Sequence, residues 1–468
     1  MRNFIGRKDY LLKLEKLWKE NKTKLVSVYG RRRVGKTELL KVFSKNKRTF
    51  FFEALEGVET SIQIKHFLAQ LSEMFQEPYL RDLDYRDWPP VFELLSQKIE
   101  QEKNILIIFD EFPWMASGRT KLVSYVKFFW DKKWKYHSHL LLILCGSIAS
   151  WMVKNVVRST ALYGRMSENV LVEPLQPSEV AIFIGNKRGQ KEILEYLLCF
   201  GGIPRYLEEF NFNQSIQLNI ENTCFEKSGF FVVEADKIFY SQFREVNLYK
   251  QIVKHLLLRP LILKDISQKL KVPSGGGLKT YLDNLSLAGI VGKMSQIENF
   301  KVAKVPHYYL ADEFLRFHAT FILPHQDEIE HTSFKKNFAK FTHHRWHPFL
   351  GYAFERFCLK HRYTIAEVLG FSQKVLGCGS MLNHQRGGYQ YDLLYLRSDA
   401  TITLVEVKYV LEPLSTSIIR EMESKIQKTS FPRGITLEKV LICNQVPTLS
   451  LEESGYFHHI LTAKDLFF

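Results

Sequence analysis

A glycine-rich loop between an apolar run and a leucine-rich segment constrains the fold of this 468-residue chain more than any other feature. Residues 24–29 are β-prone, residues 30–37 read Gly-Arg-Arg-Arg-Val-Gly-Lys-Thr, and residues 38–43 have helical spacing. The G-x-x-x-x-G-K-T spacing lets consecutive backbone N–H groups wrap phosphate groups at the start of a helix. We expect Lys36 to contact the β and γ oxygens of a nucleoside triphosphate and Thr37 to contact its metal ion.

A second apolar run, residues 104–109, ends in two carboxylates, Asp110 and Glu111. A continuous apolar run is typical of a strand that is buried on both faces of a parallel sheet, so the acids should emerge at its carboxyl end beside the phosphates. Asp110 would hold Mg²⁺ through water, and Glu111 would polarise the attacking water. An acidic turn after a core strand is the structural alternative, and the neighbouring phosphate loop argues against it.

A third apolar run, residues 140–145, is followed by Gly146 and Ser147. Ser147 is a candidate for contact with the γ-phosphate. Further along, Arg165 could reach the charge that develops in the transition state, and Arg158 is its rival. A solvated surface arginine is an equally good interpretation of either residue.

The chain carries 65 Lys and Arg against 50 Asp and Glu, a net charge of +15. This excess favours contact with phosphate-rich polymers or anionic surfaces, and nucleic acid is the first partner to consider, although a basic composition also serves solubility alone. The six cysteines form no C-x-x-C pair, which indicates reduced, buried thiols. Gly146 and Ser147 interrupt the best apolar stretch, so we expect no membrane span and a cytoplasmic location.

Five motifs together resemble the archaeal-type ATPases of the AAA+/STAND branch of P-loop proteins. They are Phe4-Ile-Gly-Arg7, the loop 30–37, the strand end Phe-Asp-Glu at 109–111, Leu-Tyr-Gly-Arg at 162–165 and Gly-Gly-Ile-Pro-Arg-Tyr-Leu at 201–207. The resemblance implies ATP as the ligand, residues Phe4 to Arg7 near its adenine, and residues 202–205 in a helical lid. The expected nucleotide-binding residues are Phe4, Ile5, Gly30, Arg31, Arg32, Arg33, Val34, Gly35, Lys36, Thr37, Glu38 and Ser147, with Thr37 and Asp110 on Mg²⁺ and with Glu111 and Arg165 as catalytic residues.

The predicted fold class is a multidomain α/β protein. We expect a P-loop ATPase core with a parallel sheet at 1–172, a helical lid at 173–242, a winged-helix domain at 243–322, a linker at 323–345 and an α/β restriction-endonuclease-like domain at 346–468. In the winged-helix segment, Lys279 and Thr280 should be exposed on the third helix, whereas Leu278, Leu282 and Leu285 should face inward. Such a domain reads DNA or serves as a spacer or protein contact.

The C-terminal part contains a second candidate catalytic site. A helix carries Glu355, and two neighbouring strands joined near residues 397–400 carry Asp392 on one and Glu406 and Lys408 on the other. Because strands alternate their side chains, the residues at 406 and 408 should share a face. Asp392 and Glu406 could then clamp one or two metal ions, and Lys408 could orient or activate water for attack on a phosphodiester. A surface hairpin with an ion pair is the alternative.

This arrangement resembles the PD-(D/E)XK nuclease fold, in the nuclease-like form that archaeal-type ATPases carry at their C-termini, except that Tyr391 stands where the motif has proline. The resemblance implies Glu355, Asp392, Glu406 and Lys408 as the cleavage site, with Mg²⁺ or Mn²⁺ on Asp392 and Glu406. The sequence therefore predicts an ATP-driven enzyme that acts on DNA and can form homo-oligomers. The rival is a STAND-type regulatory switch whose C-terminal domain binds DNA or a partner without cutting.

Overall fold

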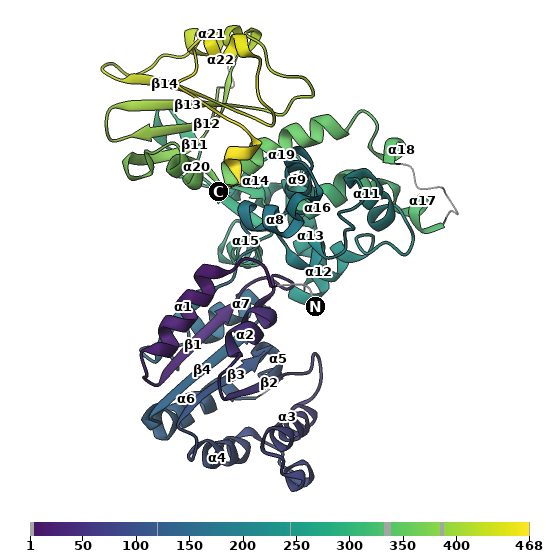
Figure 1. Ribbon diagram of the computed structural model, residues 1–468, viewed down its shortest axis with the longest axis vertical. Helices are drawn as coiled ribbons and strands as arrows, with labels where there is room; N and C mark the ends of the chain where they lie inside the picture. Colours follow the sequence, from purple (N-terminus) through teal and green to yellow (C-terminus); the bar gives the residue numbers. More distant parts are fainter. Residues whose placement is uncertain (1–3, 119, 244, 332–337, 384–387, 468) are drawn as a thin grey trace. The chain divides into compact units, whose positions relative to one another are not determined.

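The computed structural model describes residues 4–118, 120–243, 245–331, 338–383 and 388–467. Its chain divides into two compact units, Met1–Pro174 and Leu175–Phe468. Figure 1 labels the helices and strands of both units.

The first unit is built on a five-stranded sheet in the order β2-β3-β4-β1-β5, and every pair of neighbouring strands is parallel. Figure 1 shows helices packed around this sheet. The elements are α1 Lys8–Lys19, β1 Lys24–Tyr29, α2 Lys36–Ser44, β2 Thr49–Glu53, α3 Thr60–Phe75, η1 Pro78–Asp82, α4 Trp88–Ile99, β3 Asn104–Asp110, α5 Phe112–Met115, α6 Leu122–Lys132, η2 Trp134–Tyr136, β4 His139–Gly146, α7 Ala149–Met152, η3 Val153–Val157 and β5 Met166–Leu171.

Three strands of this sheet are the apolar runs that the sequence predicts. Every residue of β4 is buried, as is all of β3 after Asn104 and all of β1 before Tyr29. Helices on both faces of a parallel sheet leave no solvated face, which explains why these strands are continuously apolar rather than alternating. The parallel sheet of the predicted ATPase core is thus confirmed.

The second unit begins with a helical region and continues through two further sheets. Its elements are α8 Pro177–Ile184, η4 Gly185–Lys187, α9 Gln190–Phe200, α10 Pro204–Leu207, α11 Ile216–Cys224, α12 Glu234–Gln242, α13 Val246–Leu256, β6 Leu261–Ile262, α14 Leu263–Leu270, α15 Gly276–Leu287, β7 Val291–Met294, β8 Ile297–Glu298, β9 Lys301–Val302, β10 His307–Leu310, α16 Glu313–Phe317, η5 His318–Ile322, η6 Leu323–His325, α17 Gln326–His331, α18 Phe338–Thr342, α19 Trp346–Lys360, α20 Arg362–Val368, η7 Ser372–Lys374, β11 Val375–Leu382, β12 Gln390–Arg397, β13 Thr401–Lys408, α21 Ser417–Gln427, β14 Thr436–Cys443, α22 Leu449–Glu453, β15 His459–Leu461 and η8 Ala463–Leu466.

The segment predicted as a winged helix contains α13, α14 and α15 and a small antiparallel sheet in the order β6-β10-β7. On α15, Leu278, Leu282 and Leu285 are buried and Lys279 and Thr280 are exposed, as the sequence predicts. The winged-helix assignment itself stays a prediction.

The hairpin β8–β9 contacts the C-terminal sheet. Ile297 is 1% exposed and packs in one apolar core with Tyr391 and Leu394 of β12. A Cβ atom on Gly379 of β11 would lie 2.2 Å from the backbone oxygen of Ser295. The hairpin therefore packs against the C-terminal sheet and does not project freely as a wing.

The C-terminal sheet has five strands in the order β11-β12-β13-β14-β15, antiparallel as far as β13 and parallel beyond it. Ile418 and Met422 of α21 share a core with Leu404 of β13, so α21 covers that face of the sheet (Figure 1). The hairpin of β12 and β13 lies where the sequence predicts it.

The stretch 323–345, predicted as a linker, is helical in much of its described part. Phe338 and Phe341 of α18 are buried at 8% and 5% exposure, because two aromatic residues three apart on a helix share one face. Residues 332–337 lie outside the described part. Within the described residues, no helix is both long enough and apolar enough to cross a lipid bilayer.

Candidate functional site

The carboxyl edge of the parallel sheet gathers the predicted nucleotide-binding residues. Strand β4 lies between β1 and β3, with Tyr29 opposite Gly146 and Phe109 opposite Leu144. The loop after β1, the acids that end β3 and Ser147 after β4 therefore emerge next to one another. Ligands of open α/β sheets bind at this edge.

Lys36 begins helix α2 and is turned back into the loop. Its Nζ donates hydrogen bonds to the backbone oxygens of Gly30 at 3.1 Å and Arg31 at 3.0 Å, and the residue is only 5% exposed. Burial lowers the pKa of the Lys36 ammonium, and the nearby charges of Glu111 and Asp110 oppose that shift. The loop thus holds the Lys36 ammonium group against two neutral carbonyl groups. An anionic phosphate forms stronger hydrogen bonds with an ammonium group and can therefore replace them.

Thr37 and Asp110 meet directly across the sheet edge. The Oγ1 of Thr37 donates to Oδ2 of Asp110 at 2.7 Å, and Oδ1 of Asp110 accepts from the backbone N–H of Glu111 at 3.0 Å. Asp110 is 1% exposed. A hydroxyl and a carboxylate side by side form the oxygen-donor pair that Mg²⁺ takes in a nucleotide site, where phosphates and water supply the remaining ligands.

Glu111 and Ser147 form a second pair at this edge. The Oγ of Ser147 donates to Oε2 of Glu111 at 2.6 Å, and the backbone N–H of Ser147 lies 3.3 Å from the same oxygen. The backbone of Glu111 has φ 52°, a left-handed conformation that turns the chain sharply from β3 into α5. The structure therefore links the predicted water-polarising residue to the predicted phosphate sensor.

The glycine loop packs tightly against the last strand of the unit. Gly30 has φ 156°, and a Cβ atom there would lie 2.2 Å from the backbone oxygen of Val172. Gly35 precedes α2 with φ 86°, which an L side chain rarely adopts. Of the loop arginines, Arg31 is buried, Arg32 pairs with Glu56 at 2.9 Å, and Arg33 has φ 73°.

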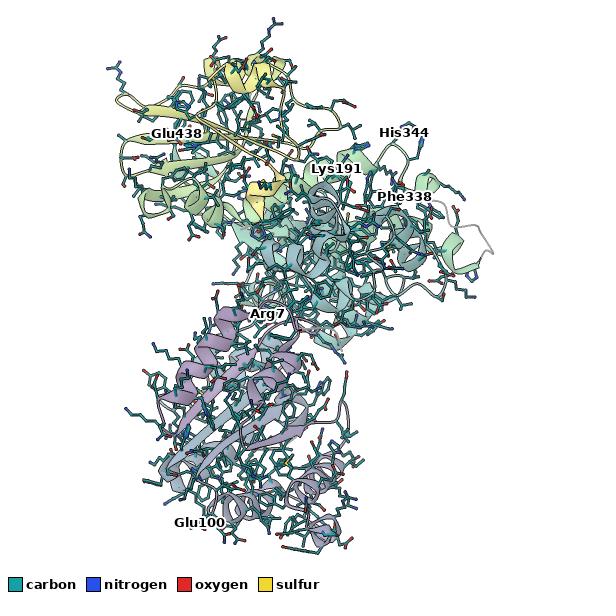
Figure 2. The ribbon with its side chains drawn as sticks, in the orientation of Figure 1. Arg7, Glu100, Lys191, Phe338, His344 and Glu438 are labelled. Atoms are coloured by element: carbon teal, nitrogen blue, oxygen red, sulfur yellow. The ribbon has the colours of Figure 1, made fainter. Side chains whose placement is uncertain are left out.

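Arg7, labelled in Figure 2, belongs to the opening segment that the resemblance places near the adenine, and its contacts with the phosphate loop are not predicted from the sequence. It is 3% exposed, its Nη2 donates to the backbone oxygen of Val34 at 2.8 Å, and its Nη1 donates to the backbone oxygen of Glu173. Arg7 thereby ties the opening segment, with the half-buried Phe4 and Ile5, to the phosphate loop.

Cys145 is a second residue that the sequence does not single out. Burial raises the pKa of its thiol well above the usual range, and the negative charge of Asp110 adds to the shift. The thiol therefore stays neutral beside the carboxylate. Cys145 lies on β4 two residues before Ser147, and alternate residues of a strand share a face. This spacing is the sequence feature that could have placed Cys145 at the site.

Two further candidates of this unit, Arg165 and Glu38, lie in ion pairs, whereas Arg158 is exposed. Arg165 forms a two-pronged pair with Asp131 of α6, with Nε to Oδ1 at 2.8 Å and Nη2 to Oδ2 at 2.9 Å, and this contact lowers the pKa of Asp131 to about 2. Glu38 of α2 is exposed and pairs with Lys41 at 3.1 Å. The role of Arg165 in catalysis stays a prediction.

The second candidate site lies on β12 and β13 in the other unit. Asp392 stands opposite Glu406, one step beyond the paired residues Leu393 and Val405. The carboxylate of Asp392 accepts from the backbone N–H of Val407 at 3.0 Å and from the side chain of Gln390 at 3.0 Å. The structure thus brings the two predicted metal ligands to one place.

Glu406 is 1% exposed and has two lysine partners. Nζ of Lys425 on α21 lies 2.7 Å from Oε1 and 2.6 Å from Oε2 of Glu406, and Nζ of Lys408 lies 3.1 Å from Oε1. Lys408 also pairs with Glu421 at 3.0 Å. Burial lowers the pKa of Lys408, but the charges of Glu406 and Glu421 outweigh it and raise that pKa, which favours the charged ammonium form.

Glu355 of α19 joins this cluster electrostatically. Burial, followed by the negative charge of Asp392, raises the pKa of Glu355 to about 7. Burial and the charge of Glu406 likewise raise the pKa of Asp392. In the part of the chain that the structure describes, no group of three or more His, Cys, Asp or Glu side chains is arranged to hold a metal ion.

Comparisons with known proteins bear on the first of these two sites. Residues 4–210 match a family described as an ATPase domain predominantly from Archaea. An uncharacterized protein of Methanocaldococcus jannaschii is 26% identical over 409 residues, 87% of either chain, and an uncharacterized ATP-binding protein of the same organism is 56% identical over 45 residues, 10% of this chain and 76% of that one.

Among solved structures, the Walker-type ATPase of Pyrococcus abyssi has a TM-score of 0.50 at 20% identity, over 67% of this chain and 95% of that one. This likeness supports the fold, and the family match supplies the activity. Through residues 4–210, the chain belongs to the family of ATP-binding ATPase domains found predominantly in Archaea.

Proposed function

We propose that this chain hydrolyses ATP with Mg²⁺ at the carboxyl edge of its parallel sheet and uses the reaction in work on DNA. The observation that carries the first part is the direct contact of Thr37 with Asp110 at 2.7 Å. These two residues come from separate motifs 73 positions apart. Their meeting supports a single oxygen-lined position for Mg²⁺ beside the phosphate loop.

Phosphate binding falls to the loop and to Lys36. The backbone N–H groups of residues 30–37 receive the phosphate oxygens, and Lys36 exchanges its two carbonyl partners for the β and γ oxygens. Mg²⁺, held by Thr37 and Asp110, would draw negative charge from those oxygens. Arg7 keeps the loop in place through Val34, because its guanidinium has no freedom to leave a buried site with two carbonyl partners.

Glu111 is proposed to position and polarise the attacking water. In the described state, Ser147 donates to one of its carboxylate oxygens, so Glu111 must share or release this bond before that oxygen can accept from water. Ser147 can turn its hydroxyl to a γ-phosphate oxygen instead. Binding of ATP and activation of water are thereby coupled through one serine hydroxyl.

Arg165 is proposed to stabilise the transition state only after it leaves Asp131. An Asp131→Asn variant weakens that pair and should therefore raise the rate of ATP hydrolysis, measured as phosphate release under saturating ATP. A rate equal to that of the wild type, with Arg165→Ala also at that rate, would remove Arg165 from the mechanism.

The test of the ATPase roles uses two variants with matched controls. Lys36→Ala should lose ATP binding and turnover, whereas Lys41→Ala, an exposed lysine of the same helix, should retain both. Glu111→Gln should bind ATP and fail to hydrolyse it, whereas Glu100→Gln, an exposed glutamate labelled in Figure 2, should hydrolyse it normally. Binding is measured by equilibrium dialysis with labelled ATP, and turnover by phosphate release with and without Mg²⁺.

Undiminished hydrolysis in Lys36→Ala or Glu111→Gln would contradict the roles proposed for these residues. Hydrolysis that continues after Mg²⁺ is chelated would contradict the metal position between Thr37 and Asp110.

A second candidate function, metal-dependent cleavage of DNA, is proposed for the C-terminal sheet. The meeting of Asp392, Glu406 and Lys408 on two paired strands, with Glu355 nearby, supports it. These carboxylates are the ligands that Mg²⁺ or Mn²⁺ takes in phosphodiester hydrolysis, and the charged Lys408 can orient water or the scissile phosphate. The net charge of +15 supports DNA as the polymer.

The rival function is a nucleotide-controlled switch in which the C-terminal domain binds DNA or a partner without cutting. The ion pair of Glu406 with Lys425 supports it, because this lysine already neutralises the carboxylate. Labelled single- and double-stranded DNA, incubated with Mg²⁺ or Mn²⁺ and with or without ATP, separates the two. Cleavage by the wild type that Glu406→Ala abolishes supports the nuclease, and an identical absence of cleavage in both supports the switch.

A further inference from the structure

Lys425 stands where a metal ion would have to bind at Glu406. Its ammonium group lies within 2.7 Å of both oxygens of a carboxylate that is 1% exposed, and the hydroxyl of Thr429 one turn later donates to the backbone oxygen of Lys425 at 2.7 Å. Tyr391 bonds the same hydroxyl at 2.9 Å, which anchors this turn of α21 to β12. The lysine is therefore held in place on both sides.

A carboxylate as buried as Glu406 needs a counter-charge to stay ionised. Lys425 supplies it with two short hydrogen bonds, and Lys408 adds a third contact to one oxygen. A divalent cation needs the same oxygen lone pairs at about 2.1 Å, and it repels an ammonium group that remains beside it. The metal and the Lys425 contact thus exclude each other at this carboxylate.

We propose that Lys425 is the resident cation of the C-terminal site and that it keeps the site free of metal until it is displaced. This inference rests on the proposed metal-dependent chemistry of Asp392 and Glu406. It assigns Lys425 as a positioning residue, because it acts through Glu406 and not on a substrate. Removing the ammonium group should create a Mn²⁺ site in the protein without DNA.

The experiment titrates Mn²⁺ into nucleotide-free, full-length protein and follows free Mn²⁺ by electron paramagnetic resonance. Lys425→Met keeps the length of the side chain and removes its charge, and we expect it to bind one further Mn²⁺ at least about tenfold more tightly than the wild type. Lys425→Arg keeps the cation and should behave as the wild type. Lys439→Met is the matched control, since Lys439 has the same 21% side-chain exposure and pairs with Glu423 instead.

The added site must depend on Glu406, so the double variant Lys425→Met with Glu406→Gln should lose it. Mn²⁺ should also raise the unfolding temperature of Lys425→Met and leave that of the wild type unchanged, because only the variant frees Oε2 of Glu406 from its lysine partner. This second measurement reports on Lys425→Met even if the variant is less stable.

Equal Mn²⁺ binding by Lys425→Met and the wild type, or a gain that survives Glu406→Gln, would overturn the inference. Its failure is distinct from that of the proposed nuclease. If the wild type cuts DNA but Lys425→Met gains no Mn²⁺ site, only the inference about Lys425 is refuted. If Lys425→Met gains the site but the protein never cuts DNA, only the proposed nuclease activity is refuted.

Discussion

Replacing Thr37 by valine isolates the contact that joins the two nucleotide-binding motifs. Valine keeps the branched shape of threonine and removes the hydroxyl that donates to Asp110 at 2.7 Å. Asp110 is 1% exposed, so water cannot replace the lost donor, and the remaining described donors to it are the N–H of Glu111 and the thiol of Cys145. Loss of a hydrogen bond to a buried charged group costs about 1.5–3 kcal/mol.

For a unit of this size, each 1 kcal/mol lowers the unfolding temperature by about 2–4 °C, which gives an expected drop of about 3–12 °C. Calorimetry of the full chain measures it, and the transition that ATP shifts upward identifies the first unit. Thr37→Ser, which keeps the hydroxyl, should lose much less. ATP hydrolysis should fall sharply in Thr37→Val because the Mg²⁺ position loses a ligand. A Thr37→Val protein as stable as Thr37→Ser would refute the claim that this bond supports the apo site.

Two further predictions concern the fold around the sites. Gly30→Ala places a Cβ atom 2.2 Å from the backbone oxygen of Val172 and should lower the free energy of unfolding by about 2 kcal/mol or more. In the control Gly189→Ala the new Cβ atom meets nothing within 4 Å, so the free energy of unfolding should change little. Urea denaturation of both variants measures the difference. Burial lowers the pKa of His318 from 6.5 to about 4, so the unfolded chain binds a proton in this window that the folded chain does not, and up to about 3 kcal/mol of stability should be lost as the pH falls from about 6.5 to about 4. A His318→Phe variant should have a flatter profile of urea midpoint against pH in that window, and an unchanged slope would contradict the assignment.

The strands that carry the nucleotide site could be predicted from the sequence because their signals are local. Residues 24–29 and 104–109 are mainly apolar runs that lead into a phosphate loop or paired acids, and β1 and β3 match these bounds to within one residue. Strand order is not a local property. That β4 lies between them, and so brings Ser147 to Glu111, depends on pairings across more than 100 residues.

Contacts between distant segments could not be predicted from the sequence for the same reason. Arg7 reaches Val34 and Glu173 through a single long side chain, and no spacing rule relates positions 7 and 173. The contact of Lys425 with Glu406 likewise joins a helix to a strand, and the sequence indicates only that Lys425 or Gln427 on this helix could assist the site.

Within the second unit, the hydrogen bond between Glu195 and Tyr409 couples helix α9 to the end of strand β13. Glu195 lies on α9, inside the ATPase family segment, and accepts from the hydroxyl of Tyr409 at 2.7 Å, while Tyr409 directly follows Lys408 of the C-terminal cluster. Glu195 is 8% exposed, so a movement of α9 that breaks this bond would leave a buried carboxyl group without its hydrogen-bond donor, which costs free energy. A displacement of α9 should therefore move the end of β13 with it, and Lys408 beside Glu406 should move as well.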